Sequence, residues 1–432
     1  MTIPNQRYAK SIEMLERARR VIPLGTQTFS KSYQQFPKDA APLFLTHGQG
    51  CRVWDVDGND YIDLISGLLP VVLGYCDPEV DAAVRDQLGR GMSFSLATEL
   101  EVELAERLVE IIPCAEMVRF GKNGSDATTA CVRIARAVTG RDRVLICGYH
   151  GWHDWYLAAT VRNKGVPACL TELVERVPYN DLEAVRAALK ARPGEIAALV
   201  MEPVGALAPA AGYLEELQAL LKAEGALLIF DEIITGFRFH LGGAQAHYGV
   251  RPDLAAFGKA MGNGMPISAV VGRADLMSQL EEIFFSATFG GEALSLAAAI
   301  AVIDKMQREP VIERLWQAGG SLAEGVRSLI ETHGLREAIS VNGLAPWSLL
   351  AFKDAGGASK EAIKTRFMQE MLQNGVLMAA SHNVTYAHGD DDIAQVLRAY
   401  DATLGVLAAE LDAGALEAKL AGPPIRPVFS VR

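Results

Sequence analysis

An acid and an amine stand at the ends of two neighbouring apolar runs in the middle of the chain. The run ALLIF ends on Asp231, and the run LAAF is followed by Gly258 and Lys259. Such runs are typical of buried parallel strands, whose carboxyl ends bind ligands in open α/β folds. A carboxylate and a primary amine there suit pyridoxal phosphate, which needs a lysine to carry it as a Schiff base and an acid to keep its ring nitrogen protonated. On these two residues alone, a structural salt bridge stays open as the alternative.

A glycine-containing turn lies upstream, between a short apolar run and a helical pattern. The segment passes from Phe120 through Asn123, Gly124 and Ser125 and meets a glycine stop at Gly140. Glycine lets the backbone approach an anion, and the free amides of a helix amino terminus point at it. The helix dipole alone contributes about 0.3 to 2 kcal/mol, so other partners must supply the rest. The turn predicts a phosphate site, and Ser125 as a plain N-cap is the alternative.

Polar side chains follow two further apolar runs. Tyr149 comes shortly after RVLIC, where its ring can stack on a planar heteroaromatic group or pack as an ordinary tyrosine. Glu202 ends the run IAALVM. The repeated order of strand, helix and strand predicts an α/β fold with a mostly parallel central sheet and helices on both faces.

The periodicity of apolar residues divides the chain into three parts. We expect an amino-terminal segment of helix and hairpin, a large domain that holds the cofactor, and a carboxy-terminal lobe of charged amphipathic helices. The two terminal parts together are expected to form a smaller α+β domain. The expected boundaries are residues 1–75, 76–309 and 310–432.

Bulk composition excludes several classes of protein. The chain has 432 residues and a net charge of −11, which argues against a nucleic-acid-binding or anionic-membrane surface. Its six cysteines form no CxxC pair and all fall in the first half, so we expect no metal site, no disulfide framework and a cytoplasmic location. No apolar run approaches the roughly 20 residues of a membrane helix, and the amino terminus has no signal-peptide core.

Taken in order, these pieces resemble the class III aminotransferases, the fold-type I enzymes that depend on pyridoxal phosphate. Among them, the chain is most similar to glutamate-1-semialdehyde aminomutase and its relatives. The resemblance covers nearly the whole chain through eight motifs, GCRVWDVDGNDYIDLISG, MVRFGKNGSDA, YHG, MEPV, DEIITGFR, GKAMGNGMP, TFGGE and YAHGDDDI. Eight motifs in this order are far more specific than any one of them. The resemblance implies a homodimer with its active site at the interface.

The resemblance also implies a role for each residue of the site. Lys259 is the implied Schiff-base lysine, and Asp231 is the implied partner of the pyridinium nitrogen. Tyr149 and Ile233 would cover the two faces of the ring. Thr288 would reach the phosphate of the neighbouring subunit's cofactor. The remaining implied cofactor contacts are Asn123, Gly124, Ser125, His150 and Glu202.

Departures from the family pattern bear on the substrate. Semialdehyde aminomutases carry Asn-Ser-Pro-Val-Arg after the first helix, whose serine and arginine hold the substrate carboxylate, and this chain has QTFSK at residues 27–31. A gating glutamate of the carboxy-terminal lobe is missing from AASHN at residues 379–383. Ile234 stands where ornithine- and 4-aminobutyrate-type members have glutamine, and Glu292 replaces the usual asparagine after two glycines. We therefore expect none of those substrates.

The expected function is transfer of an amino group from an amino-acid donor to a keto or aldehyde intermediate. Surface-polysaccharide, nucleotide-linked and secondary-metabolite pathways are the expected settings. An isomerase, either an aminomutase or an amino-acid racemase, would use the same Asp231 and Lys259 and stays open. A nucleotide-binding module without pyridoxal phosphate lacks support, because no G-x-G-x-x-G follows the first strand and no Walker lysine is present. The candidate substrate contacts are Thr28, Lys31, Trp152, His153 and His382.

Overall fold

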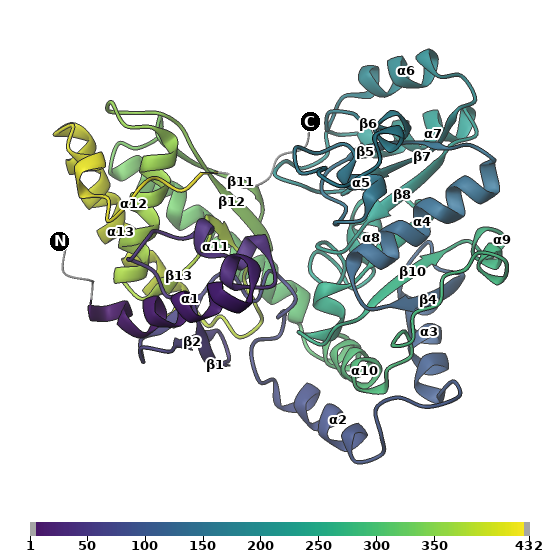
Figure 1. Cartoon of the computed structure of the whole chain (residues 1–432), viewed down its shortest axis with the longest axis horizontal. Coiled ribbons are helices and arrows are strands. Elements are labelled where there is room, and N and C mark those ends of the chain that lie inside the picture. The colour runs from purple at the N-terminus through teal and green to yellow at the C-terminus, as the bar shows by residue number, and fades with distance from the viewer. Residues whose placement is uncertain (1–5, 427–432) are drawn as a thin grey trace. The chain divides into compact units, whose positions relative to one another are not determined.

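The computed structural model describes residues 6–426, which fold into two compact units (Figure 1). One unit, here the terminal unit, contains residues 6–68, 73–76 and 313–426 of the described part. The other, here the central unit, is made of residues 69–72 and 77–312. Segments from the first and last parts of the described chain therefore form one unit, while the other is formed almost entirely by one continuous segment.

A seven-stranded sheet lies at the centre of the central unit, with the strand order β4-β10-β9-β8-β7-β5-β6. The neighbours from β9 to β6 pair in parallel, and β10 runs antiparallel to both β9 and β4. This confirms the predicted α/β fold with a mostly parallel sheet. The strands are β4 (Met117–Gly121), β5 (Arg143–Cys147), β6 (Val174–Arg176), β7 (Ile196–Met201), β8 (Leu227–Asp231), β9 (Leu254–Phe257) and β10 (Ser268–Gly272).

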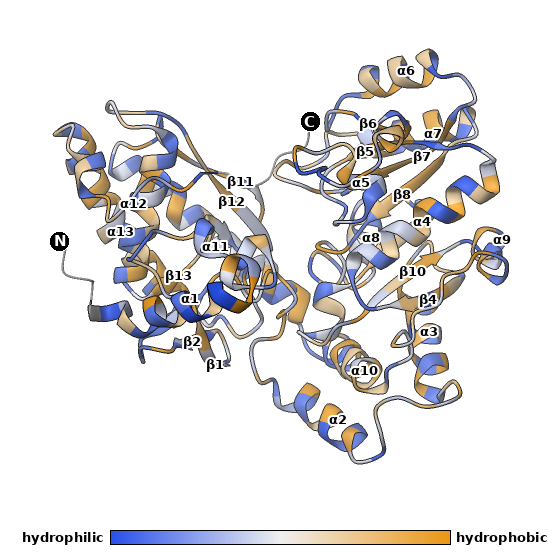
Figure 2. Ribbon diagram, viewed as in Figure 1, coloured by the Kyte–Doolittle hydropathy of each residue, from blue (hydrophilic) through white to orange (hydrophobic). Residues whose placement is uncertain are grey.

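Helices cover this sheet because its strands are apolar on both faces. All six residues of β7 and all four of β9 are buried, and Figure 2 shows apolar residues along β7 and β8. Helix α4 packs against β7, β9 and β10. The helices of this unit are α2 (Pro78–Leu88), α3 (Glu99–Ile111), α4 (Gly124–Thr139), α5 (Asp154–Leu157), α6 (Leu182–Ala191), α7 (Tyr213–Ala223), α8 (Gly243–Tyr248), α9 (Ala274–Met277) and α10 (Ala293–Arg308).

Two small sheets organise the terminal unit. The first has the order β1-β2-β3-β13, and the second has the order β11-β12-β14. A turn at residues 57–58 joins β2 to β3 in the expected amino-terminal hairpin. The Asp55 carboxylate accepts the backbone N–H of Asn59 at 2.8 Å, and Gly58 has a φ of +92°. The strands are β1 (Leu45–Gln49), β2 (Arg52–Asp55), β3 (Asp60–Asp63), β11 (Ile339–Leu344), β12 (Trp347–Phe352), β13 (Val376–Leu377) and β14 (Ser381–His382).

Pairing between distant parts of the sequence holds the terminal unit together. Strand β13 pairs in parallel with β3, and Val376 is the partner of Ile62. The unit's helices are α1 (Ala9–Val21), α11 (Val311–Thr332), α12 (Lys360–Gln373) and α13 (Asp390–Asp412).

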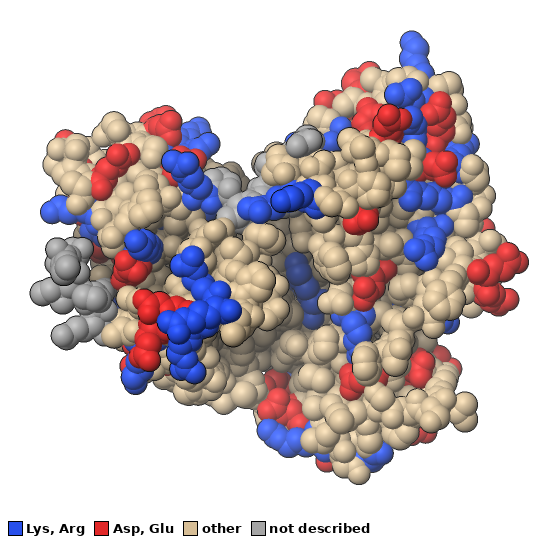
Figure 3. Space-filling model, viewed as in Figure 1, with Lys and Arg blue, Asp and Glu red and all other residues tan. Residues whose placement is uncertain are grey.

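Figure 3 shows basic and acidic side chains side by side on the viewed face. Among residues 6–426, no helix is long and apolar enough to span a membrane.

Candidate active site

The acid and the amine lie at the same edge of the large sheet. Asp231 is the last residue of β8, and its register partner Ala256 lies on β9, three residues before Lys259. Because β8 and β9 are parallel, their carboxyl ends meet at one edge, as expected from the sequence. No ion pair between Asp231 and Lys259 is found in the described part of the chain. The alternative of a structural salt bridge between them is therefore not what the structure contains.

Asp231 instead has a histidine as its partner. Nδ1 of His150 lies 2.8 Å from Oδ2 of Asp231, and both side chains are buried. The other carboxylate oxygen accepts the backbone N–H of Ile233 at 3.2 Å. A proton on Nδ1 makes His150 the donor in this pair and fixes the orientation of the carboxylate. Nε2 of His150 is buried and has no hydrogen-bond partner among residues 6–426.

A second carboxylate positions the tyrosine that follows β5. Oε2 of Glu202, directly after β7, accepts the backbone N–H of Tyr149 at 3.0 Å. Gly148 allows this approach, since it has a φ of +119° and a Cβ there would lie 2.5 Å from Oε2 of Glu202. Burial, and then the nearby charge of Asp231, raise the pKa of Glu202 to about 7. Tyr149 is 52% exposed and meets Tyr156 edge to face, at 5.6 Å between ring centroids.

Lys259 has the environment of a reactive amine. Burial lowers the pKa of its amine, and the negative charges of Glu202 and Asp231 partly oppose that shift. The φ of Lys259 is +40°, a left-handed backbone conformation that residues other than glycine rarely adopt. Such strained conformations are often found at active sites. A lowered pKa leaves more of the amine neutral near pH 7, the form that attacks a carbonyl and accepts a proton.

The glycine turn before α4 forms a narrow cradle. Oδ2 of Asp126 accepts the backbone N–H of Asn123 at 2.8 Å, which holds the turn closed. No acceptor for the N–H of Gly124 or Ser125 is found within the described residues. Oγ of Ser125 accepts the backbone N–H of Trp152 at 3.2 Å. The first turn of α4 therefore presents two backbone donors beside a hydroxyl, which is the donor set of a phosphate site.

Close packing joins this cradle to the lysine. A Cβ on Gly124 would lie 3.1 Å from the Ile233 side chain, and a Cβ on Gly258 would lie at the same distance from it. Gly151, with a φ of +101°, faces Ser125, whose Oγ would lie 2.2 Å from a Cβ at that position. Ile233 thus connects the start of α4 with the residue before Lys259. Only glycine fits at these approaches without displacing a neighbour.

These residues fit pyridoxal phosphate. The cradle at Gly124 and Ser125 suits its phosphate, and the half-exposed ring of Tyr149 and the side chain of Ile233 suit the faces of a flat ring. Asp231, oriented by His150, suits a protonated ring nitrogen, and Lys259 suits the aldehyde carbon. No group of three or more histidine, cysteine, aspartate or glutamate side chains that could hold a metal ion occurs among the described residues.

The remaining predicted residues of the central unit lie in varied surroundings. Thr288 is exposed in the loop before α10, and Asn123 is exposed directly before α4. Trp152 is 65% exposed. Nδ1 of His153 lies 2.7 Å from the hydroxyl of Thr129 on α4. Sequence reasoning named His150 only as a contact and missed its pairing with Asp231, because 81 residues separate the two.

The other three substrate candidates belong to the terminal unit. Thr28 and Lys31 are exposed, and the Thr28 hydroxyl accepts the backbone N–H of Lys31 at 3.1 Å. His382 is buried, with its two ring nitrogens 2.7 Å from the hydroxyls of Ser348 and Tyr400. Burial lowers the pKa of His382 to about 3. This histidine packs in the core with both nitrogens occupied, which does not favour the expected role of His382 as a substrate contact.

One departure from the family pattern has a structural reason. The Glu292 carboxylate accepts the backbone N–H of Leu294 at 2.8 Å and so caps α10. It also lies 3.0 Å from Nζ of Lys122, in the segment that leads into the phosphate cradle. A carboxylate at position 292 therefore ties the cradle to the start of α10.

Comparisons with known proteins identify the family of the chain. A family model described as aminotransferase class-III matches residues 33–394. The chain is 36% identical over 404 residues to a 3-aminobutyryl-CoA aminotransferase from Cloacimonas acidaminovorans, covering 91% of this chain and 96% of the relative. It is 36% identical over 418 residues to a glutamate-1-semialdehyde 2,1-aminomutase from Methanothrix thermoacetophila, covering 90% and 95%. The solved structure of the FumI protein from Sphingopyxis sp. MTA144, which contains PLP, is 30% identical with a TM-score of 0.87, covering 95% and 98%.

Proposed function

Since the chain belongs to the class III aminotransferases, which depend on pyridoxal phosphate, we propose that it aminates a carbonyl intermediate carried on a nucleotide-type group. The amino donor is an amino acid, and the acceptor carbon is a ketone or an aldehyde. The observation that supports this most directly is the pairing of His150 with Asp231 at the strand end next to Lys259. A carboxylate held in one orientation beside a buried amine is what this chemistry requires.

Each residue of the site has a definite task in the proposed reaction. When bound, the cofactor supplies an electron sink that stabilises a carbanion at the substrate α-carbon. Asp231 holds a proton on the ring nitrogen, and His150 holds Asp231 in place through its Nδ1–H. The Nζ atom of Lys259, once free, accepts the α-proton and later returns a proton, a role that its lowered pKa favours. Gly124 and Ser125 would bind the phosphate of the cofactor, and Tyr149 would pack on its ring.

The nucleotide-type carrier is supported by both the sequence and a relative. The departure at residues 27–31 removes the serine and arginine that hold a free semialdehyde carboxylate in aminomutases, and residues 379–383 lack their gating glutamate. The relative from Cloacimonas acidaminovorans is named for a coenzyme A thioester, and coenzyme A contains an adenine nucleotide. A substrate of this kind is bound partly through its carrier, so it does not depend on an arginine at position 31.

A homodimer in the cytoplasm is part of the same proposal. Thr288 and the neighbouring Phe289, which is 58% exposed, lie in the loop before α10. An exposed phenylalanine beside a hydroxyl suits burial against a second copy, where Thr288 would contact the other subunit's cofactor phosphate. Size measurement of the holoenzyme, together with loss of cofactor affinity in Thr288→Ala, is the corresponding test.

An isomerase is the second candidate, and the aminomutase relative at 36% identity favours it. It would use the same residues but return the amine to its own substrate. The two functions differ in one respect, because an aminotransferase needs a second substrate and an isomerase does not.

A half-reaction screen tests the proposal. Yellow holoenzyme is mixed with single amino acids and with 3-aminobutyryl-CoA, and the loss of its visible absorbance is followed. We expect at least one amino acid to convert the enzyme fully, and the converted enzyme to recover on addition of a keto acid. Turnover of one substrate without any second amine or carbonyl compound would instead establish the isomerase.

A further inference from the structure

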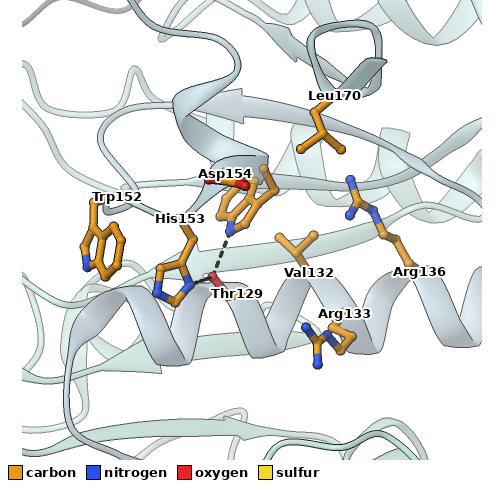
Figure 4. Close-up of a pocket in the computed structure, with 9 residues that line it drawn as sticks. Thr129, Val132, Arg133, Arg136, Trp152, His153, Asp154 and Leu170 are labelled. Atoms are coloured by element: carbon orange, nitrogen blue, oxygen red, sulfur yellow. Dashed lines mark hydrogen bonds between the residues drawn. The ribbon is translucent and has the colours of Figure 1, made fainter. Parts of the chain in front are cut away.

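A pocket of about 420 Å³ lies beside helix α4, and none of the proposed cofactor contacts lines it. Its floor is α4, and its walls are the segment around Trp152, the start of α5, and Leu170 (Figure 4). A second pocket of about 310 Å³ shares Thr129, Arg133 and His153 with the first. The volume of the larger pocket is within the range of small-molecule sites.

One stripe of α4 supplies the floor. Thr129, Val132, Arg133 and Arg136 are spaced by three, four and seven residues, which places them on one side of a helix. Thr129 lies one turn after Ser125, so the pocket begins roughly 6 Å along the helix axis from the phosphate cradle. The same helix therefore serves the cradle with its amino terminus and this pocket with its flank.

Two arginines in the pocket form no ion pair within the described structure, although the charge of Asp142 acts on the guanidinium of Arg136. Nη1 of Arg133 donates to the carbonyl of Phe284 at 3.0 Å, and Nε of Arg136 donates to the carbonyl of Asp142 at 2.8 Å. Neither guanidinium forms an ion pair with any residue between 6 and 426, although acidic residues outnumber basic ones in this chain. Each guanidinium has five N–H donors, so each retains several for an anion. Asp154, at the rim, is exposed and is the only acid lining the larger pocket within the described structure.

A hydrogen-bond chain orients a third donor. The Thr129 hydroxyl accepts the indole N–H of Trp155 at 2.8 Å and lies 2.7 Å from Nδ1 of His153 (Figure 4). No other acceptor for the Thr129 hydroxyl hydrogen is found in the described structure, so that hydrogen is assigned to Nδ1 of His153. This assignment leaves the proton of the neutral imidazole on Nε2. His153 then presents an N–H donor in addition to the two arginines.

Trp152 supplies an exposed flat surface at the same place. Its side chain is 65% exposed and meets His153 edge to face, at 4.9 Å between ring centroids. Its backbone N–H is bound to Oγ of Ser125, which fixes the start of this wall. An exposed indole and two arginines that line one pocket are a combination that can bind a planar base together with its phosphates.

We propose that this pocket binds the nucleotide portion of the amino acceptor, with Arg133 and Arg136 on the phosphates and Trp152 stacked on the base. The proposal rests on the function proposed above and extends it, because it assigns the carrier to residues outside the cofactor site. Binding through the carrier would add affinity without touching the reacting carbon. Variants of the pocket should therefore change substrate affinity and leave the chemistry at Lys259 unchanged.

Calorimetry on the holoenzyme tests the pocket directly, because bound pyridoxal phosphate already fills the cradle of α4. We expect ADP to bind, and inorganic phosphate to bind at least about tenfold more weakly, since it lacks a ring to stack. Arg133→Gln and Arg136→Gln should each weaken ADP binding roughly tenfold or more, as expected for the loss of a charged hydrogen-bond donor. Arg186→Ala removes the same charge from an exposed site on α6 and is the control that should leave ADP binding unchanged. ADP binding that Arg133→Gln and Arg136→Gln leave as unchanged as the control does, or ADP that binds no better than phosphate, would overturn the proposal.

Half-reaction kinetics then distinguish a pocket that binds the nucleotide portion of the substrate from a pocket that binds a regulatory nucleotide. In the reverse half-reaction, 3-aminobutyryl-CoA serves as the aminated form of a carrier-bound acceptor. Arg133→Gln should raise its half-saturating concentration about tenfold and should not change the reaction of free 3-aminobutyrate. Added ADP should compete with the thioester and leave the reaction of the free amino acid unaltered. If ADP changes the rate of the reaction with the free amino acid, the pocket binds a regulatory nucleotide, and the proposal that it binds the substrate's carrier is overturned. If no amine reacts at all, the proposed function fails, while calorimetry still reports whether the pocket binds ADP.

Discussion

Replacing Asp231 with asparagine removes one charge from the site and keeps the shape of the side chain. The carboxylate is 5% exposed and accepts hydrogen bonds from His150 and from the backbone N–H of Ile233. An asparagine carbonyl can still accept the N–H of Ile233, so the strand end should keep its conformation. What the variant loses is the negative charge that keeps a proton on the cofactor's ring nitrogen.

The magnitude follows from the burial of that charge. Breaking a buried charge pair costs roughly 3–5 kcal/mol. Each 1.36 kcal/mol added to the activation free energy lowers the rate about tenfold. If the whole cost is added to the activation free energy of the half-reaction, its rate falls by about two to four decades. We therefore expect Asp231→Asn to bind pyridoxal phosphate and to react with its amino donor at least about a hundredfold more slowly.

Single-turnover absorbance measurements with a saturating amino donor give this rate without the influence of product release. Asp253→Asn is a matched control, since the Asp253 carboxylate accepts the backbone N–H of Leu228 at 2.9 Å at the opposite end of the same strands. That variant should lose stability and keep its rate. An Asp231→Asn enzyme with a full complement of cofactor and a rate within threefold of the natural protein would refute the reasoning.

Three further outcomes are expected. Lys259→Ala should have no borohydride-reducible link between cofactor and protein, by mass spectrometry, and a link found elsewhere would reassign the lysine. Gly151→Ala should weaken cofactor binding by an order of magnitude or more, because its Cβ would lie 2.2 Å from Oγ of Ser125. Gly165→Ala is the control, since Gly165 also has a positive φ, of +91°, but has open space around it, and this variant should change only stability. Burial lowers the pKa of His382 from its ordinary 6.5 to about 3 in the folded protein. The unfolded state therefore binds a proton more readily, so the stability that His382 contributes is fully present above about pH 6.5 and is lost as the pH falls toward 3. His382→Leu should lower the thermal midpoint, flatten that acid dependence and leave the half-reaction rate unchanged, and a lost rate at full folding would return His382 to the substrate site.

The cofactor end of the site could be predicted because its signals are local in sequence. Asp231 ends one apolar strand and Lys259 follows another, and parallel pairing brings such strand ends to the same edge of the sheet. The turn at Gly124 likewise carries its own glycine and helix start. The fold class was predictable for the same reason, because the alternation of buried strands and helices is visible in the sequence.

The partners of these residues were not predictable to the same degree. His150 meets Asp231 only because β5 and β8 lie on either side of β7, an order that the sequence does not state. His382 looked available for a substrate, but Ser348 and Tyr400 occupy its nitrogens from 34 and 18 residues away. The arginine stripe of α4 becomes a pocket only when the segment around Trp152 folds over it. Each of these features depends on contacts between distant segments, for which residue type and spacing carry no signal.

The pairing of β13 with β3 determines the order in which the units can form on a ribosome. Val376 is synthesised 314 residues after its partner Ile62, which takes roughly 15 to 60 s at about 5–20 residues per second. The central unit is complete in sequence by residue 312 and can fold while the carboxy-terminal part is still being made. During that interval the edge of β3 has no strand beside it and is open to pairing with other chains. Slow synthesis or truncation before Val376 should therefore favour aggregation through the amino-terminal hairpin, even when the cofactor-binding sheet is already folded.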